Sequence, residues 1–284
     1  MSLFPTKVNF DICTFCNHKC TFCSNADERT LKESVSYSDF ISVMDNITKY
    51  VAIDELGLSA KGEVLLNKDI VKIVRATKER YNVRYLYIST NGAILSKELA
   101  SDLLQAGLDS IKFSINGYNE VSYKAVHLKD DFSKVVKNFN DLLELKKTKY
   151  PHTKILISSI INRDKKELEE SFKSYFSSNY ELINAILKYD ITYTPKFKDF
   201  KVAMAKLKPC PLVFNEIYID SDCRLGLCCK DYFKEFDYGS LLKHDFKELY
   251  LGAQMSSIRT MHQTMEFPEN HFCKNCLLFE SANA

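Results

Sequence analysis

This 284-residue sequence lacks the features of membrane-spanning, exported and nucleic-acid-binding proteins. No uninterrupted apolar run approaches the roughly 18 residues that a membrane-spanning helix needs, and residues 1–11 lack the apolar core of a signal peptide. The charges show no excess of one sign, since 39 lysines and arginines stand against 37 aspartates and glutamates. Domains that grip a nucleic-acid backbone are strongly basic. We therefore expect a cytoplasmic protein that binds neither membranes nor nucleic acids.

Cysteine is missing from the whole middle of the chain, although the sequence contains ten. Four lie between Cys13 and Cys23, and six lie between Cys210 and Cys276. Structural cysteines would scatter through the core, so two terminal groups indicate two sets of ligands. Disulfides are the first alternative, but a reducing cytoplasm disfavours them. Groups of three or four thiolates select zinc or iron–sulfur clusters.

The first group contains a C-x₃-C-x₂-C triplet, formed by Cys16, Cys20 and Cys23. Structural zinc usually takes two ligand pairs separated by a short finger, and no fourth ligand follows this triplet nearby. We interpret Cys13 as a small buried residue on the incoming strand. His18 lies inside the triplet, and we expect its ring to point to solvent.

Strand-like and helix-like segments alternate along the first 200 residues. Short apolar or alternating segments at 7–12, 53–59, 85–89, 110–115, 154–161 and 187–193 predict strands. Amphipathic segments between them predict helices, three of which we expect Ser38, Asn67 and Ser96 to cap. Repeated strand–helix pairs are typical of a parallel α/β layer, either an open sheet or a partial barrel.

The organisation of the chain changes near Pro195, where a lysine-rich connector begins. Beyond it come a hairpin-like strand at 214–220, the cysteines between 223 and 229, a helix, and a final C-x₂-C pair. We predict a first domain at residues 1–200 and a cysteine-bearing annex at residues 201–284.

Polar residues follow the predicted strands at their carboxyl ends, where parallel α/β proteins place their chemistry. The cysteine triplet follows the first strand, and Gly62 and Glu63 follow the second. Asn91 follows the third strand, and Ser114 ends the fourth. These residues are therefore expected at one edge of the sheet.

The triplet, with the aromatic Phe22 before its last cysteine, resembles the signature of the radical S-adenosylmethionine (SAM) enzymes. Lys61-Gly62-Glu63-Val64 is similar to the G-G-E-P motif of that superfamily, without its first glycine and its proline. Thr90-Asn91-Gly92 and Ser114-Ile115-Asn116-Gly117 are similar to its TNG and SxDG stretches, with Asn116 in place of the common aspartate. The resemblance implies a partial parallel (β/α)5-6 barrel.

It also implies a [4Fe–4S] cluster held by the triplet, with one iron left open to chelate SAM. One electron from the cluster then cleaves SAM to a 5′-deoxyadenosyl radical, which abstracts a substrate hydrogen. Glu63, behind Gly62, would accept a hydrogen bond from the SAM ammonium group. Ser114 and Asn91 would contact the ribose or the carboxylate of SAM, and Phe22 would pack near its adenine.

The annex resembles the twitch domain, a shortened SPASM domain found on many of these enzymes, including aminocyclitol dehydrogenases. Its hairpin is similar to the pattern D-x-D-G-x₄-C, with Cys223 in place of the glycine, and this register selects Cys228 rather than Cys229. The resemblance implies an auxiliary [4Fe–4S] cluster with four ligands. These are Cys210, Cys228, Cys273 and Cys276.

A cluster with four thiolates has no iron free for substrate and is suited to moving electrons. We therefore predict a monomeric radical SAM oxidoreductase that converts an alcohol to a ketone on a small sugar- or aminocyclitol-like molecule, with flavodoxin or ferredoxin as electron donor. Lys188, Tyr189 and Tyr193 are open candidates for the proton acceptor. The alternatives are modification of a peptide or protein side chain, a redox-neutral sugar epimerisation or dehydration, and a non-catalytic zinc-binding interaction module.

Overall fold

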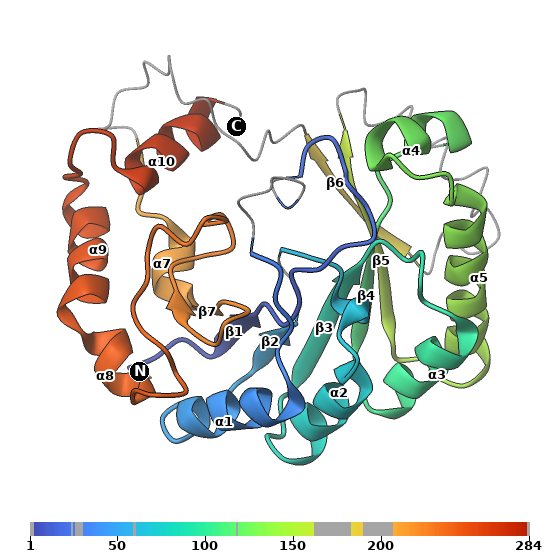
Figure 1. Cartoon of the computed structure of the whole chain (residues 1–284), viewed down its shortest axis with the longest axis horizontal. Coiled ribbons are helices and arrows are strands. Elements are labelled where there is room, and N and C mark those ends of the chain that lie inside the picture. The colour runs from blue at the N-terminus through green and yellow to red at the C-terminus, as the bar shows by residue number, and fades with distance from the viewer. Residues whose placement is uncertain are drawn as a thin grey trace.

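One mostly parallel sheet organises the computed structural model, which describes residues 3–23, 25, 31–58, 61–117, 119–161, 183–189 and 207–282. The strands run in the order β6-β5-β4-β3-β2-β1-β7-β8, parallel except for the antiparallel pair of β7 and β8. The strands are β1 (Lys7–Phe10), β2 (Glu55–Gly57), β3 (Tyr85–Thr90), β4 (Ser110–Ser114), β5 (Lys154–Ile161), β6 (Ile183–Tyr189), β7 (Glu216–Ile219) and β8 (Leu225–Gly226). This curved sheet, with helices outside it (Figure 1), confirms the predicted α/β class and partial barrel.

Helices follow the strands as the alternating pattern predicts. The helices of the barrel are α1 (Tyr37–Thr48), the short 3-10 helix η2 (Val64–Leu66), α2 (Ile70–Glu79), α3 (Lys97–Gln105), α4 (Glu120–His127) and α5 (Phe132–Thr148). Those of the annex are α7 (Pro211–Asn215), α8 (Phe246–Leu251), α9 (Ala253–Thr264) and α10 (Phe272–Ala282). In the part of the chain that the structure describes, no helix is long and apolar enough to cross a bilayer.

The two faces of β1 show how the sequence builds the barrel. Val8 and Phe10 are completely buried toward the helices, where Phe10 stacks on Phe40 of α1 at 5.5 Å. Asn9 faces the other way, accepting a hydrogen bond from the Tyr87 hydroxyl at 2.9 Å and donating one to Glu216 at 2.6 Å. The alternation in sequence therefore separates an apolar outer layer from a polar interior.

Two of the three predicted helix caps are wrong, each by two residues. Ser36, not Ser38, caps α1, and Asp69, not Asn67, precedes α2. Asn67 is instead buried, and its side-chain amide donates to two main-chain carbonyl groups that border the cysteine loop, at 3.0 and 2.9 Å. Ser96 caps α3 as predicted. A buried amide that ties a loop to a strand end has the same sequence signal as a cap.

The annex does not begin as an isolated hairpin, because its first strand extends the sheet. β7 pairs in parallel with β1, with Tyr218 opposite Asn9, before turning back into β8. Cys223 lies in that turn at φ +60, which explains why glycine is usual at this position. Residues 190–206 lie outside the described residues, as does the helix predicted around Leu168–Phe176, so the boundary at residue 201 stays a prediction.

Candidate metal centres and the network between them

The three thiols of the first group lie in the loop that leaves β1. Cys16 is exposed, Cys20 and Cys23 are half-buried, and the Cys23 amide donates to the Cys20 carbonyl oxygen at 3.0 Å. Burial raises the pKa of Cys16 to about 11, and the charges of Glu63 and Cys23 add to the shift. Burial, with the charges of Cys23 and Cys16, raises the pKa of Cys20 to about 12. Thiolates so close together need cations to compensate them, and iron supplies these when a cluster binds. The three thiols therefore fit a metal centre.

Gly62 allows the loop after β2 to pack directly on the cysteine loop. A Cβ atom at this position would collide with the carbonyl oxygens of Cys13 and Phe15. The Glu63 amide also donates to the Phe15 oxygen, at 2.8 Å. Any side chain at position 62 would thus separate the glutamate from the cysteines.

The Glu63 carboxylate accepts hydrogen bonds from the end of β3 and from the segment after β2. Its Oε1 accepts from the Thr90 hydroxyl at 2.7 Å and from the Leu65 amide at 3.1 Å, and its Oε2 accepts from the Asn91 amide at 2.7 Å. The side chain is 2% exposed, and burial raises its pKa despite these bonds. Since Oε2 accepts one bond from the residues that the structure describes, it keeps acceptor capacity for a cationic ligand group.

The remaining predicted SAM-contacting residues occupy different positions at the same edge. The Asn91 side chain donates to Asn17, inside the cysteine loop, at 2.8 Å, and so joins the β3 end to that loop. Phe22 is half-buried in the turn between Cys20 and Cys23. Ser114 is half-buried at the end of β4, opposite Ser158 of β5. The hydrogen-bond network thus brings Asn91 to the loop, while Ser114 lies one strand farther along the sheet.

The prediction that His18 points to solvent is wrong. Its ring is 4% exposed and lies edge-on against His127, the last residue of α4, with the ring centres 5.2 Å apart. The Thr21 amide also donates to the carbonyl oxygen of Val126 at 2.9 Å. The cysteine loop therefore rests on the last turn of α4, a long-range contact that the local spacing of the triplet does not reveal.

The four predicted auxiliary ligands come from three elements of the annex. Cys210 precedes α7, Cys228 follows β8, and Cys273 and Cys276 lie in the first turns of α10. Burial raises the pKa of Cys273 to about 12, and the charges of Cys276 and Cys210 add to this effect. Burial also raises the pKa of Cys228, which Cys276 affects in turn. These electrostatic couplings connect Cys273 with Cys210 and Cys276, and Cys228 with Cys276, and the four-ligand set stays a prediction that they favour.

Cys229 differs from Cys228 in its surroundings. Burial is the main cause of the raised pKa of Tyr87 and of Tyr218, and the charge of Cys229 adds a smaller contribution to both. The charge of Cys229 also raises the pKa of Cys228, to which Cys276 adds a smaller contribution. The choice of Cys228 as ligand remains a prediction.

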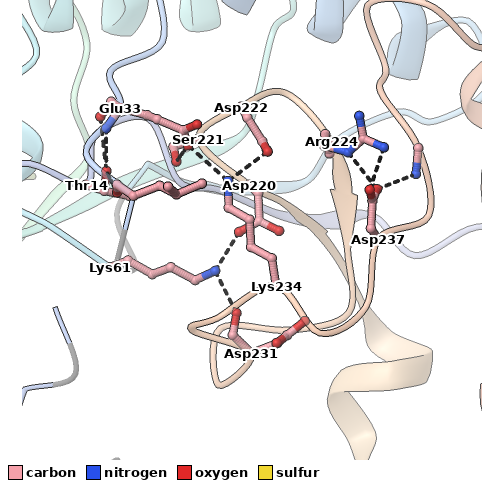
Figure 2. Close-up of polar contacts among 12 residues, drawn as sticks. Thr14, Glu33, Lys61, Asp220, Ser221, Asp222, Arg224, Asp231, Lys234 and Asp237 are labelled. Carbon is pink, nitrogen blue, oxygen red and sulfur yellow. Dashed lines mark hydrogen bonds and ion pairs between the residues drawn. The ribbon is translucent and has the colours of Figure 1, made fainter. Parts of the chain in front are cut away.

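A buried ion pair connects the loop after β2 to the annex (Figure 2). The Lys61 ammonium donates to Asp220 Oδ1 at 2.5 Å and to the Asp231 carbonyl oxygen at 2.7 Å. The side chains of Lys61 and Asp220 are 1% and 4% exposed. Lys61 occupies the place of the first glycine in the family motif, and this contact gives that departure a structural reason.

Asp11 completes the group around Lys61. Its side chain is fully buried, and neither carboxyl oxygen has a hydrogen-bond partner within the described part of the chain. Burial raises the pKa of Asp11 to about 7, while Lys61 opposes the shift and Asp220 reinforces it. With one cation between two carboxyl groups, Asp11 retains its proton up to near neutral pH.

A second contact between the two parts of the chain centres on Glu33 (Figure 2). Its Oε2 accepts from the Ser221 hydroxyl at 2.8 Å and from Lys234 at 2.9 Å, and Lys234 also pairs with Asp222 at 2.8 Å. The Glu33 amide donates to the Thr14 hydroxyl at 2.7 Å, directly beside the cysteine loop. Both aspartates of the D-x-D pattern therefore take part in this connection. Asp220 pairs with Lys61 of the barrel, and Asp222 pairs with Lys234, which also binds Glu33.

Sequence reasoning did not identify Asp11, His127 or Asp220 as parts of this site. Asp11 has the clearest available signal, because a charged residue directly after a strand of alternating pattern points into the barrel. For His127 and Asp220, the decisive partners are more than 100 positions away in sequence.

Comparison with known proteins agrees with this arrangement. The profile of the Radical SAM superfamily matches residues 11–174, and that of the SPASM iron-sulfur cluster-binding domain matches residues 210–277. A "Probable GTP 3',8-cyclase" of Thermococcus kodakarensis is 25% identical over 272 residues, covering 95% of this chain and 80% of the relative. A protein of the same name from Saccharolobus islandicus is 29% identical over 56% of this chain, which spans 48% of that relative.

Solved structures are similar over nearly the whole chain. BtrN in complex with AdoMet and 2-DOIA has a TM-score of 0.63 at 12% identity, covering 92% of this chain and 88% of that one. AnSMEcpe with bound AdoMet has a TM-score of 0.68 at 13% identity, covering 97% and 96%. SuiB of Streptococcus suis bound to precursor peptide SuiA also has a TM-score of 0.68 at 13% identity, covering 98% and 70%. At these identities the similarity shows a common fold.

Proposed function

Because the chain belongs to the radical SAM superfamily and carries a SPASM-type iron–sulfur domain, we propose that it oxidises a hydroxyl group of a small sugar- or aminocyclitol-like substrate. The net change is the loss of two hydrogens as an alcohol carbon becomes a ketone. When bound, the SAM-binding cluster and SAM supply the abstraction of one hydrogen atom, and the auxiliary cluster supplies an acceptor for the remaining electron. The other hydrogen leaves as a proton.

The residues of the chain divide into those that hold these groups and those that orient them. Cys16, Cys20 and Cys23 would hold the first cluster, and the four annex thiols the second. Gly62 keeps Glu63 against the cysteine loop, where Oε2 can accept from the SAM ammonium group. Asn91 would orient the same loop through Asn17.

The observation that supports the proposal is the electrostatic coupling among the predicted ligand thiols of the annex. Cys210 and Cys276 both act on Cys273, and Cys276 also acts on Cys228. Four thiolates would complete the ligands of a [4Fe–4S] cluster and leave no iron for substrate. This arrangement favours electron transfer, and electron removal is what distinguishes an oxidation from a redox-neutral rearrangement.

The charges between the two thiol groups favour a substrate without phosphates over a nucleoside triphosphate. Lys61 is already paired with Asp220, and Lys234 is paired with Glu33 and Asp222. These two cations are therefore not free to neutralise phosphates. The names of the relatives nevertheless make GTP 3',8-cyclisation the second candidate.

Product stoichiometry tests the proposal. The reconstituted enzyme is incubated anaerobically with SAM, a reductant and carbon-deuterated polyols or aminocyclitols, and GTP is offered in parallel. We expect label in 5′-deoxyadenosine, one SAM consumed per product, and a product two hydrogens poorer than its substrate. Consumption of GTP, or a product isomeric with its substrate, would overturn the oxidation. We also propose that the electron donor is a flavodoxin or ferredoxin and that the enzyme works as a monomer.

A further inference from the structure

A series of hydrogen bonds connects Cys20 to the ends of α4 and α5. The His127 Nδ1 atom lies 3.4 Å from Cys20 Sγ and 3.1 Å from His18 Nδ1, and His18 Nε2 lies 3.1 Å from the Asp131 carboxylate. The possible ligand atoms of His18, Cys20 and His127 all lie within 4.8 Å of one another. The direction of each bond decides what this group can do.

The main chain fixes the proton on His127. The Asn116 amide donates to His127 Nε2 at 3.1 Å, and a main-chain N–H can only donate. Nε2 is therefore the unprotonated nitrogen of a neutral ring, and Nδ1 carries the hydrogen. This assignment follows from a backbone group and requires no choice of side-chain orientation.

The carboxylate of Asp131 fixes His18 in the complementary tautomer. Asp131 accepts a hydrogen bond, so His18 Nε2 carries the hydrogen and His18 Nδ1 offers a lone pair. The His127 Nδ1–H group then has two acceptors, His18 Nδ1 and the sulfur of Cys20. Asn116 donates to His127 and His18 donates to Asp131, so one hydrogen, on His127 Nδ1, is left to face both His18 Nδ1 and the cysteine sulfur.

We propose that His127 is a positioning residue that donates a hydrogen bond from Nδ1 to the sulfur of Cys20, and thereby raises the reduction potential of the SAM-binding cluster. Hydrogen bonds to ligand sulfurs stabilise the more negative, reduced cluster, and a second residue often fixes the donor's orientation. His18 competes for the same hydrogen, and Asp131 keeps His18 in its accepting tautomer. Tyr123, stacked on His127 at 4.0 Å, holds the ring in place.

Two substitutions at position 127 separate the hydrogen bond from the packing. His127→Phe keeps an aromatic ring but removes both nitrogens, whereas the amide nitrogen of His127→Asn can occupy the place of Nδ1. In the reconstituted holoenzyme, the first cluster is followed by electron paramagnetic resonance as the signal that changes when SAM is added. Reductive titration of that signal gives its potential independently of turnover.

We expect the ratio of reduced to oxidised first cluster in His127→Phe, at a fixed potential, to fall about tenfold. This corresponds to a reduction potential lower by about 59 mV for one electron. His127→Asn should restore most of this loss. His18→Phe should shift the potential the opposite way, because it removes the competing acceptor. The exposed His152 provides a matched control, since His152→Phe should leave the potential unchanged.

Two results would overturn the proposal. An unchanged potential in His127→Phe, with four irons still bound at the first site, would show that the bond does not act on the cluster. Loss of iron in both His127 variants, with circular dichroism unchanged, would instead make His127 an iron ligand. Neither result depends on the identity of the substrate.

Discussion

Replacing Lys61 with methionine should destabilise the protein by several kilocalories per mole, although the side chain lies outside the thiol groups. Methionine preserves most of the packing but removes the ammonium group that donates to Asp220 at 2.5 Å (Figure 2). Breaking a buried ion pair on one side costs about 3–5 kcal/mol, because the other charge remains buried. For a chain of this size this corresponds to a fall of roughly 6–10 °C in Tm.

The pH dependence gives the prediction its specific signature. Without Lys61, Asp220 must stay protonated in the folded protein, while it is ionised in the unfolded chain above its ordinary pKa of 3.8. Each pH unit then costs about 1.4 kcal/mol, so the penalty relative to wild type should grow by about 3 kcal/mol between pH 6 and pH 8. Lys61→Met should therefore be closest to wild type at the acidic end.

Anaerobic thermal unfolding of the reconstituted protein, followed by circular dichroism at pH 6 and pH 8, measures both effects. Lys61→Met/Asp220→Asn should recover much of the loss, because the second change removes the unpaired charge. Lys137→Met is the matched control, since Lys137 is 72% exposed and its pair with Asp141 is worth less than about 1 kcal/mol. A Lys61→Met protein as stable as Lys137→Met, or equally destabilised at both pH values, would refute the buried-pair reasoning.

Three further predictions concern neighbouring groups. The pKa of Asp11 is raised to about 7 in the folded protein, so its contribution to stability is complete below pH 4 and is lost as the pH rises to about 7. Asp11→Asn should flatten that part of the curve of Tm against pH. An unchanged curve would contradict the raised pKa. Gly62→Ala should lower iron occupancy at the first site, measured by iron counting and electron paramagnetic resonance, because its Cβ meets main-chain oxygens; Gly252→Ala, whose nearest such contact is 3.0 Å, should retain full iron. Cys228→Ala should lose the auxiliary cluster, seen as about four fewer irons per chain, whereas Cys229→Ala should retain it; equal losses would show that the register of the hairpin is wrong.

The sequence predicts the alternating elements of the barrel because each strand and helix carries its own periodic pattern. Ser96 shows this well, since a cap acts within a few residues of its own position. Asn67 has the same local signal but a different role, because its amide bonds the chain near Ile12 and Val35. Local patterns thus predict which residues matter, and long-range contacts decide what they do.

The failures of prediction around the thiol groups concern residues whose partners are far away in sequence. His18 sits between two cysteines, where a loop residue is usually solvated, but the end of α4 brings His127 against it and the start of α5 brings Asp131. Lys61 is visible in the sequence only as a departure from the family motif. The role of Lys61 depends on its contact with Asp220, which follows β7. No local pattern in the sequence predicts that β7 pairs with β1.

The pairing of β7 with β1 gives the two thiol groups a fixed relation. The first group follows β1, and Asp220 follows β7, so both leave neighbouring parallel strands at the same edge of the sheet. Lys61 joins that edge to the loop after β2, which also carries Gly62 and Glu63. A shift of the annex would therefore pull on the residues placed to hold SAM, whereas a glycine at position 61 could make no such link. Position 61 thus couples the two halves of the chain because it departs from the motif, and Lys61→Gly should loosen the annex without removing any thiol.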